Sequence, residues 1–325
     1  MELWKDHYYY RSGVKWMPGK SKDVIDYSVD KIRPLFCEKE KVEVSEFNYE
    51  GFYSELNSSD DLQKSAQLFI QYIIKQKLKL TTENISKSLV YRDFKEPIIE
   101  ASKNGFEVHI ASLNHDLLVE ELFHSEPLFS DGFLVEAKEP LNVRRTIGPS
   151  EEDVYEPVRE FTKTNWSKIN LYKLHGSIDL YSVQNDETFF KCPFHPDWVI
   201  DSSGKYKGVN FQPLFVTGKK PNDLYLSHKL ISKLYEKYSN SLVTSEKLIV
   251  IGYGFEDDVV NDIIIDKYLE CEGTEVYIVD KNEDKSVVES KVFSKLSSIN
   301  KEGVKIFNDG FEGFVLTDEF KNLFV

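Results

Sequence analysis

The chain has 325 residues and a mass of 37.8 kDa, a length that suggests one large domain or two smaller ones. Hydrophobic residues make up 41% and charged residues 30%, a globular composition that excludes disorder over most of the chain. The 41 basic and 55 acidic residues give a net charge of −14. A chain this acidic is a poor general ligand for phosphate backbones, so we expect no direct binding of nucleic acid.

No stretch approaches the ~20 consecutive apolar residues that a membrane-spanning helix needs. The N-terminal sequence MELWKDHYYYR is too polar for a signal peptide. The three scattered cysteines, Cys37, Cys192 and Cys271, disfavour a disulfide framework and fit a reducing compartment. They form no C-x-x-C pair, so the chain cannot build a four-cysteine zinc site. We therefore expect a cytoplasmic protein with no membrane contact and no bound metal.

Residues 1–105 are expected to form a helical region packed on the core. Apolar residues at steps of three and four across residues 60–80 predict an amphipathic helix. A second helix is expected to begin near Thr82 and to end at Asn104-Gly105, because glycine typically follows the last helical turn.

From residue 106 to 325 the pattern changes to strands alternating with helices. Strands are expected at FEVHIASLN, INLYK, LYSV, PLFVTGK, KLIVIGYGF, TEVYIVD and VKIF, and helices at DLLVEELF, LYLSHKLISKLYEKY and DDVVNDIIIDKYL. A polar insert is expected at about 136–168, and hairpin or loop material at about 188–208. This alternation predicts an α/β fold: a Rossmann-like parallel sheet with helices on both faces, plus the helical N-terminal and insert regions.

Ligands of an open parallel sheet bind where its strands end, at their carboxyl ends. The residues that directly follow the expected strands are Asn114 to Asp116, His175 to Ser177, Gly218-Lys219, Gly252 to Gly254, and Asp280 to Asn282. The set is polar and interrupted by glycines.

Two glycines, Gly252 and Gly254, flank Tyr253 between an apolar strand and a helix. Glycines at such a turn let the backbone approach a phosphate or ribose, but without a third glycine they equally fit a tight strand–helix turn. Asp280 ends the next strand, 26 residues beyond Gly254. It fits a ribose-hydroxyl partner or a solvated helix cap.

His175 stands between an apolar strand and a Gly-Ser pair, where an imidazole could act as general base. His109, in the middle of a strand, is expected to have a core role. Cys192 and His195 could ligate a metal, but two ligands do not make a site.

In the segment SLNHD, Asn114 could hydrogen-bond a sugar or a carboxamide, and Asp116 could cap the helix that follows. The chain contains neither G-x-S-x-G nor a P-loop, so the α/β-hydrolase and P-loop NTPase classes are excluded.

Four segments together resemble the sirtuins. SLNHD is similar to their T-x-N-x-D segment, and KLHGSID to the segment that carries the catalytic histidine. LIVIGYGFEDDVVNDII is similar to the I-G-Y-S-F-x-D-x-x-I-N strand and helix of bacterial sirtuin-like domains, and YIVDKNE to the ribose-contact strand. Their order agrees over about residues 106–290. The chain thus resembles the bacterial sirtuin-like family, and its motifs resemble those of the NAD-cleaving effectors of anti-phage defence systems.

The resemblance implies an NAD glycohydrolase that takes NAD as substrate and releases nicotinamide and ADP-ribose. It implies that Asn114 contacts the nicotinamide ribose and positions water, that Asp116 supports that side of the pocket, and that His175 acts on the ribose hydroxyls or the water. The implied NAD-binding residues are Gly176, Ser177, Gly252, Tyr253, Gly254 and Asp280.

One departure is that the family's first strand and its G-A-G-x-S loop have no counterpart here. The first fifty residues hold only Gly13 and Gly19, and neither follows an apolar strand. The true start could lie upstream, the chain could have lost strong NAD binding, or another part of the pocket could replace the loop. A missing first strand would leave a sheet edge or a gap exposed.

The resemblance also implies control by a homo-oligomer or by a separate sensor, such as an Argonaute-like protein or a translocase-type ATPase. The alternative is a weakly active or inactive sirtuin-fold subunit that binds NAD or ADP-ribose or scaffolds a complex. Protein deacylation is least favoured, because deacylating sirtuins generally carry a four-cysteine zinc ribbon. Hydrolysis, cyclisation and ADP-ribosyl transfer share one intermediate, so the sequence does not separate them.

Overall fold

The computed structural model describes residues 88–134, 141–147, 152–162, 166–185, 187–193, 198–210, 213–214, 228–270, 274–282, 284–296 and 303–324. The helix expected over residues 60–80, the helix start near Thr82 and most of the strand expected at PLFVTGK lie outside these ranges.

One parallel sheet contains the first two expected core strands. Its order is β1-β7-β2, with β7 in the centre. All five residues of β7 are buried, as expected of a strand covered on both faces. The bounds are β1 Val108–Ser112, β2 Phe129–Ser130 and β7 Ile169–Lys173.

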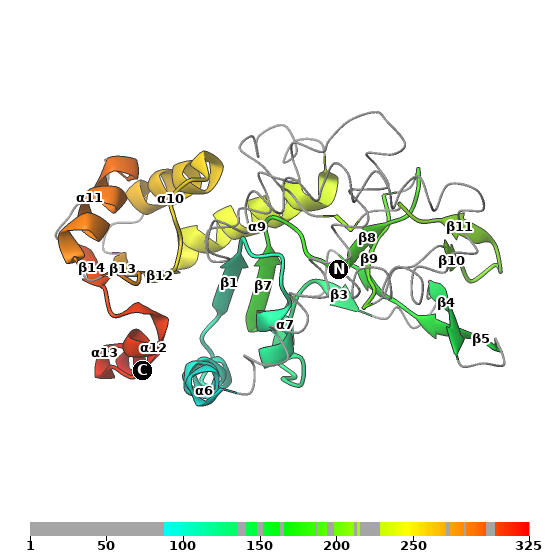
Figure 1. Cartoon of the computed structure of the whole chain (residues 1–325), viewed down its shortest axis with the longest axis horizontal. Coiled ribbons are helices and arrows are strands. Elements are labelled where there is room, and N and C mark those ends of the chain that lie inside the picture. The colour runs from blue at the N-terminus through cyan, green and yellow to red at the C-terminus, as the bar shows by residue number, and fades with distance from the viewer. Residues whose placement is uncertain are drawn as a thin grey trace, which may run out of the picture. The chain divides into compact units, whose positions relative to one another are not determined.

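A second parallel sheet contains the last three expected strands, in the order β12-β13-β14 (Figure 1). The central strand β13 is the most deeply buried of the three. Among the described residues, the parallel strands form two three-stranded sheets. The bounds are β12 Lys247–Ile251, β13 Glu275–Val279 and β14 Val304–Phe307.

Helices cover both faces, which confirms the α/β prediction. On one face α9, α10 and α11 enclose a core with Tyr172 of β7 and Ile278 of β13. On the other face α12 and α13 pack on Tyr277 of β13, and α6 and α7 pack on Ile169 of β7. The bounds are α6 Leu89–Lys103, α7 Leu118–Phe123, α9 Lys229–Thr244, α10 Asp258–Glu270, α11 Lys285–Lys295, α12 Gly310–Val315 and α13 Asp318–Asn322.

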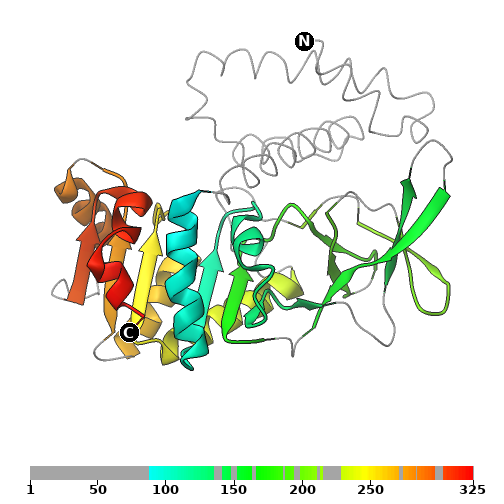
Figure 2. The same cartoon turned by 90° about the horizontal axis from the view of Figure 1, so that it is seen from below.

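Helices α6 and α9 each pack on both parallel sheets. Phe94 of α6 packs in the cluster around Tyr277 and also in the cluster around Ile169. Figure 2 shows α6 lying across the region between β12 and β1. Its C-cap is Asn104, and Gly105 has a φ of +102°, which confirms the expected helix stop.

The expected polar insert contains strands of its own. Two four-stranded antiparallel sheets, β3-β6-β9-β8 and β11-β10-β4-β5, combine strands from before and after β7. Tyr181, Phe190 and Val199 form part of their core. The bounds are β3 Phe133–Leu134, β4 Asn142–Ile147, β5 Glu152–Pro157, β6 Arg159–Phe161, β8 Leu180–Ser182, β9 Phe189–Lys191, β10 Trp198–Ile200 and β11 Tyr206–Gly208.

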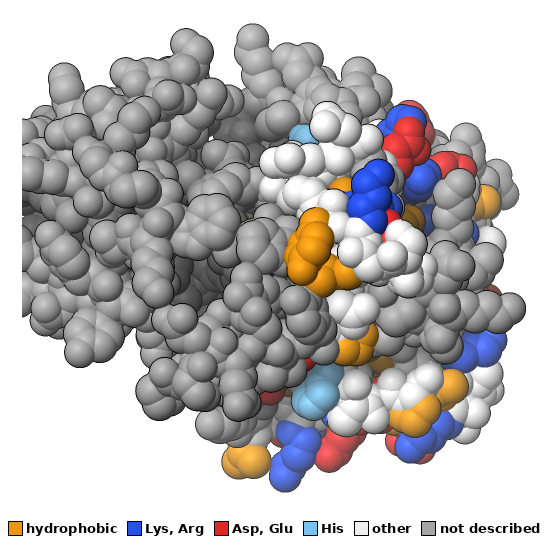
Figure 3. All heavy atoms as spheres, turned by 90° about the vertical axis from the view of Figure 1, so that its right-hand side faces the viewer, with side chains coloured by type: hydrophobic (Ala, Val, Ile, Leu, Met, Phe, Trp, Pro, Cys, Tyr) orange, Lys and Arg blue, Asp and Glu red, His pale blue; other side chains and the backbone are white. Residues whose placement is uncertain are grey.

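Figure 3 shows the face on the insert side, where basic, acidic and hydrophobic side chains are interspersed among the coloured residues. Tyr206 of β11 is a large exposed side chain of this insert, 58% accessible. None of the helices in the described ranges combines the length and apolar character that a bilayer crossing requires.

Candidate functional site

The carboxyl ends of β7 and β12 are joined by a hydrogen bond between side chains that follow them. Nε2 of His175 lies 2.7 Å from Oδ2 of Asp257. His175 follows β7, and Asp257 immediately precedes α10, the helix after β12. Both side chains are largely buried, with exposed fractions of 15% and 7%. The structure thus places the expected catalytic histidine at the predicted edge of the fold.

Asp257 is held in place by the first turn of α10. Its Oδ1 accepts from the backbone N–H groups of Val259, at 3.0 Å, and Val260, at 3.2 Å. Oδ2 faces His175, and the Tyr235 hydroxyl lies 3.4 Å from the same oxygen. Burial alone would raise the pKa of Asp257, but the hydrogen bonds from His175 and the backbone outweigh it, so this pKa lies below its ordinary value.

The carboxylate fixes the tautomer of a neutral His175. An ionised carboxylate only accepts hydrogen bonds, so Nε2 must carry the proton and Nδ1 keeps its lone pair. A histidine oriented in this way can accept a proton at Nδ1 while Asp257 stabilises the cation that forms.

Tyr253 supports this pair from the loop after β12. Its hydroxyl lies 2.9 Å from the carbonyl oxygen of Asp257 and 3.0 Å from Oδ1 of Asn261. The Asn261 amide donates to the carbonyl of Phe255. Burial, then the charge of Asp257, raise the pKa of Tyr253, which keeps the phenol protonated. The Tyr253 hydroxyl therefore donates within the protein, to Asp257 or Asn261, and its proton is not needed by a ligand.

The segment after β1 combines an exposed amide with buried anchors. Asn114 is exposed, and among the described residues none hydrogen-bonds its side chain. His115 is only 1% exposed, and its ring centroid lies 6.3 Å from that of His175. The Leu118 N–H donates to Oδ1 of Asp116 at 2.9 Å, which forms an Asx turn just before α7. Asp116 is not the N-cap residue expected from the sequence, because that position is Leu117 and carries no side-chain cap bond. Asn114 is thus the side chain available to a ligand.

Gly176 and Ser177 shape the turn after β7. Gly176 has a φ of +76°, a conformation that favours glycine. Ser177 is fully buried, and its hydroxyl donates to Oδ1 of Asp179 at 2.5 Å. Their described contacts are structural.

The loop after β12 leaves open space beside Gly252. This glycine has a φ of +61°, and a Cβ placed there would meet no atom within 4 Å. Its N–H donates to the carbonyl of Val279 at 2.9 Å, which sets the loop beside the end of β13 and so beside Asp280. Oδ2 of Asp280 lies 3.7 Å from Nζ of Lys291. A Cβ at Gly254 would make only an ordinary 3.6 Å contact.

A buried ion network behind the site was not expected from the sequence. Nζ of Lys191 lies 2.8 Å from Oε1 of Glu120 and 2.9 Å from Oδ2 of Asp131. Arg159 also pairs with Asp131. Lys173 of β7 donates to the carbonyl of Asp116 at 2.5 Å and lies 3.9 Å from Glu120. The network therefore connects the insert to the segment that carries Asn114.

Sequence reasoning also missed Asp257 and Asn261 as site residues. A signal for both was present in the F-x-D-x-x-V-N spacing from Phe255 to Asn261. The network lacked such a signal, because its members come from four separate elements and from the turn between β2 and β3.

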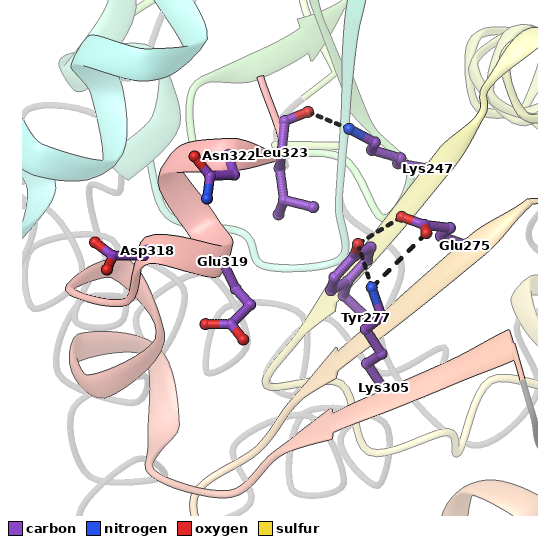
Figure 4. A pocket seen from close by; sticks show the side chains of 8 residues that line it. All are labelled: Lys247, Glu275, Tyr277, Lys305, Asp318, Glu319, Asn322 and Leu323. Carbon is purple, nitrogen blue, oxygen red and sulfur yellow. Dashed lines mark hydrogen bonds and ion pairs between the residues drawn. The ribbon is translucent and has the colours of Figure 1, made fainter. Parts of the chain in front are cut away.

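A cavity of about 480 Å³ lies at the amino ends of the second sheet's strands, opposite the site (Figure 4). The Tyr277 hydroxyl donates to Glu275 at 2.5 Å, and Lys305 donates to Tyr277 at 3.0 Å. Lys247 donates to the carbonyl of Leu323. These polar groups satisfy one another, so the cavity offers few unpaired donors to a ligand.

In the part of the chain that the structure describes, no group of three or more His, Cys, Asp or Glu side chains lies close enough together to hold a metal ion. Cys192 is buried in the insert core, and His195 lies outside the described ranges.

The family described as SIR2-like domain matches residues 108–306, which is more than half of the chain. The match begins at the first residue of β1 and ends within β14, so it includes both parallel sheets and the histidine–carboxylate pair. No curated protein matches the chain. Because the family model matches more than half of the chain and includes strands of both parallel sheets, the chain belongs to the SIR2-like family.

Proposed function

We propose that the chain cleaves NAD, releasing nicotinamide and leaving ADP-ribose. The observation that carries the proposal is the His175–Asp257 pair at the strand ends of a SIR2-like domain. The available amide of Asn114 is adjacent in sequence to His115, whose ring neighbours that of His175. These groups match the task, since the reaction needs a base and a polar group that positions ribose or water.

In the proposed reaction the bond from the ribose C1′ to nicotinamide breaks, and its electron pair leaves with nicotinamide. A water oxygen then bonds to C1′, and Nδ1 of His175 takes the water's proton. Asp257 stabilises the resulting imidazolium through the 2.7 Å contact. Asn114 orients the ribose hydroxyls or the water. Gly252, with open space beside it, and Asp280 would hold the adenosine half.

The test is nicotinamide release from NAD by the purified full chain, with and without proteins that co-purify. His175→Ala and Asn114→Ala are expected to lose release by about 10²-fold or more. His124→Ala is the matched control: His124 is exposed at the end of α7 and hydrogen-bonds the Glu121 carbonyl. Release that survives unchanged in His175→Ala would contradict the proposal.

The second candidate is a subunit that binds NAD or ADP-ribose without cleaving it. The division of the parallel strands into two sheets favours this candidate, because the family's glycine loop follows a strand not found among the described ones. Saturable NAD binding by calorimetry, with no nicotinamide released under any condition, would establish it. Protein deacylation is least favoured, and release of product from an acetyl-lysine peptide with NAD would revive it.

The wider role that we propose is that of a cytoplasmic effector in bacterial anti-phage defence. Its support is the resemblance of the LHGSI and IGYGF segments to those effectors. An enzyme that depletes NAD must be kept off in a healthy cell, so we expect activation by a homo-oligomer or by a sensor protein. Native mass spectrometry that finds a lone, constitutively active monomer would contradict this role.

A further inference from the structure

Lys173, the last residue of β7, is a buried lysine whose ammonium group donates to a main-chain oxygen. Its side chain is 5% exposed, and its Nζ lies 2.5 Å from the carbonyl oxygen of Asp116. A carboxylate oxygen, Oε2 of Glu120, lies 3.9 Å from the same Nζ, which is too far for a hydrogen bond. The short contact of this lysine is therefore with the main chain of the segment after β1.

Glu120 explains how the charge of Lys173 is kept buried. Its Oε1 lies 2.8 Å from Nζ of Lys191, and its Oε2 has no hydrogen-bond partner among the described residues. Glu120 therefore attracts Lys173 through space without taking up its hydrogen bond. Buried ion networks are often no more stabilising than apolar residues of similar volume. A role beyond stability therefore gives a reason for a lysine at this position.

The main chain of Lys173 fixes the turn that carries His175. The carbonyl of Lys173 accepts from the Gly176 N–H at 2.9 Å. The Leu174 N–H donates to the Ser112 carbonyl at 3.0 Å, which ties this turn to the end of β1. One residue thus holds two segments, because its main chain bonds the turn of His175 and its side chain bonds the segment after β1.

Asn114 depends on its neighbours in the chain for its position, because none of the described residues hydrogen-bonds its side chain. The Ser112 carbonyl, two residues before it, accepts from the Leu174 N–H. The Asp116 carbonyl, two residues after it, accepts from Nζ of Lys173. The first of these anchors joins main-chain groups, whereas the second uses a side chain and can be removed by substitution.

We propose that Lys173 is a positioning residue, which holds the Asn114 amide at a fixed place relative to His175. The inference rests on the proposed function, in which Asn114 orients the ribose hydroxyls or the water while His175 takes the proton. A misplacement of about 1 Å can cost a reaction about 10²-fold. Lys173 needs no contact with NAD for this role, because it acts through Asn114.

A double-mutant cycle in the full chain tests whether Lys173 acts through Asn114. Lys173→Met is expected to lower kcat for nicotinamide release by about 10²-fold, with KM for NAD changed by less than about threefold. In the Asn114→Ala background the same substitution should lower kcat by less than about threefold, because the group that it positions is gone. Equal fold-losses in the two backgrounds would overturn the proposal, since independent effects multiply.

Lys168→Met is the matched control for loss of a lysine beside β7. Lys168 is 40% exposed and pairs with Glu107 at 3.0 Å, so this variant should keep the wild-type kcat. If Lys173→Met does not fold, Lys173→Gln replaces it in the cycle. The glutamine amide is a neutral donor whose nitrogen lies one bond closer to the main chain than Nζ, and the same pattern of losses is expected.

Amide hydrogen exchange measures the same anchor without NAD. The peptide over residues 112–118 is expected to exchange at least about tenfold faster in Lys173→Met than in wild type, while the peptide over β13 stays unchanged. Lys168→Met should leave both peptides unchanged. No increase at residues 112–118 would overturn the proposal even in an active enzyme. A wild-type chain that releases no nicotinamide would contradict the proposed function alone, and hydrogen exchange would then decide whether Lys173 holds the segment.

Discussion

Nε2 of His175 and Oδ2 of Asp257 lie 2.7 Å apart although the two residues follow strands of different parallel sheets in the described part of the fold. His175 follows a strand of the first sheet, and Asp257 precedes the helix after β12 of the second. The orientation of the proposed base therefore depends on how the two sheets are held together. The cores around α9 and α6 provide that connection.

Asp257→Asn is expected to lower kcat for nicotinamide release by about 10²–10⁴-fold while leaving NAD binding nearly unchanged. An asparagine amide can donate to Nε2, which would move the imidazole proton to Nδ1 and remove the base. Asp258→Asn is the matched control, because this neighbouring carboxylate is exposed. Steady-state kinetics with calorimetric NAD binding measure both effects. Equal losses in the two variants would contradict the assigned tautomer.

Gly252→Ala is expected to destabilise the protein by about 1–2 kcal/mol, because an L-residue at a φ of +61° is strained although its Cβ has space. The same Cβ would enter the open space beside the loop, so NAD binding should weaken as well. Gly254→Ala should cost less, because its added Cβ makes only an ordinary contact. Thermal melts and NAD titrations of the two variants, measured side by side, decide the matter; a larger loss at Gly254 would refute this view of the loop.

Asp116→Ala is expected to cost about 0.5–1.5 kcal/mol of unfolding free energy, because the Leu118 N–H loses its hydrogen-bond acceptor just before α7. Asp116→Asn should recover most of this loss, since its amide oxygen can accept the same bond. Denaturant unfolding of the three proteins measures the difference. If the asparagine variant is as unstable as the alanine variant, the carboxylate charge matters more than the Asx-turn hydrogen bond.

Lys191→Met is expected to destabilise the fold by about 3–5 kcal/mol, because it leaves Glu120 and Asp131 buried with less compensating charge. Lys229→Met is the control, since Lys229 pairs with Glu187 on the surface and both side chains are more than 60% exposed. That variant should change stability by about 1 kcal/mol at most. Similar losses in the two variants would show that the buried network contributes little.

The same network predicts a pH dependence. Burial would raise the pKa of Glu120 and of Asp131, but neighbouring lysines, with Arg159 beside Asp131, hold both pKa values below normal. Their contribution to stability is present above an unfolded pKa of about 4 and is lost as pH falls toward the lower folded values.

The pKa of Lys191 is shifted the other way. Burial alone would lower it, but Asp131, Asp179 and Glu120 raise it above normal, so its contribution holds below about pH 10 and fades as pH rises through the folded value. Denaturant unfolding should therefore show the Lys191→Met deficit shrinking below about pH 4, where the carboxylates become protonated. A constant deficit across pH would contradict this account.

Much of the core could be predicted from the sequence, because its strands and helices are short, regular and separated by glycines. INLYK, KLIVIGYGF and TEVYIVD become β7, β12 and β13, and KLHGSID places His175 at a strand end. Hydrophobic pattern and turn chemistry are local properties, and they are sufficient to predict these elements.

The remainder depends on contacts between residues far apart in the chain. The bond from His175 to Asp257 and the pairing of Lys191 with Glu120 cannot be obtained from local pattern. The same is true of the insert, where β4 pairs with β10 although β7 lies between them in the sequence. Its polar composition predicted an insertion but gave no strand pairing, since short strands of mixed polarity have weak periodicity.

The excursion that carries β3 to β6 leaves the first sheet after Ser130 and returns at Ile169, and these positions lie on neighbouring paired strands because Phe129 is paired with Ile169. A loop whose ends are held together by the sheet loses only about 0.6 kcal/mol when its length doubles. Its size is therefore nearly decoupled from the register of β2 and β7. Evolution can therefore lengthen or shorten turns within this excursion while the strand that ends at His175 stays as it is, as long as β6 and β4 keep their pairing with β9 and β10.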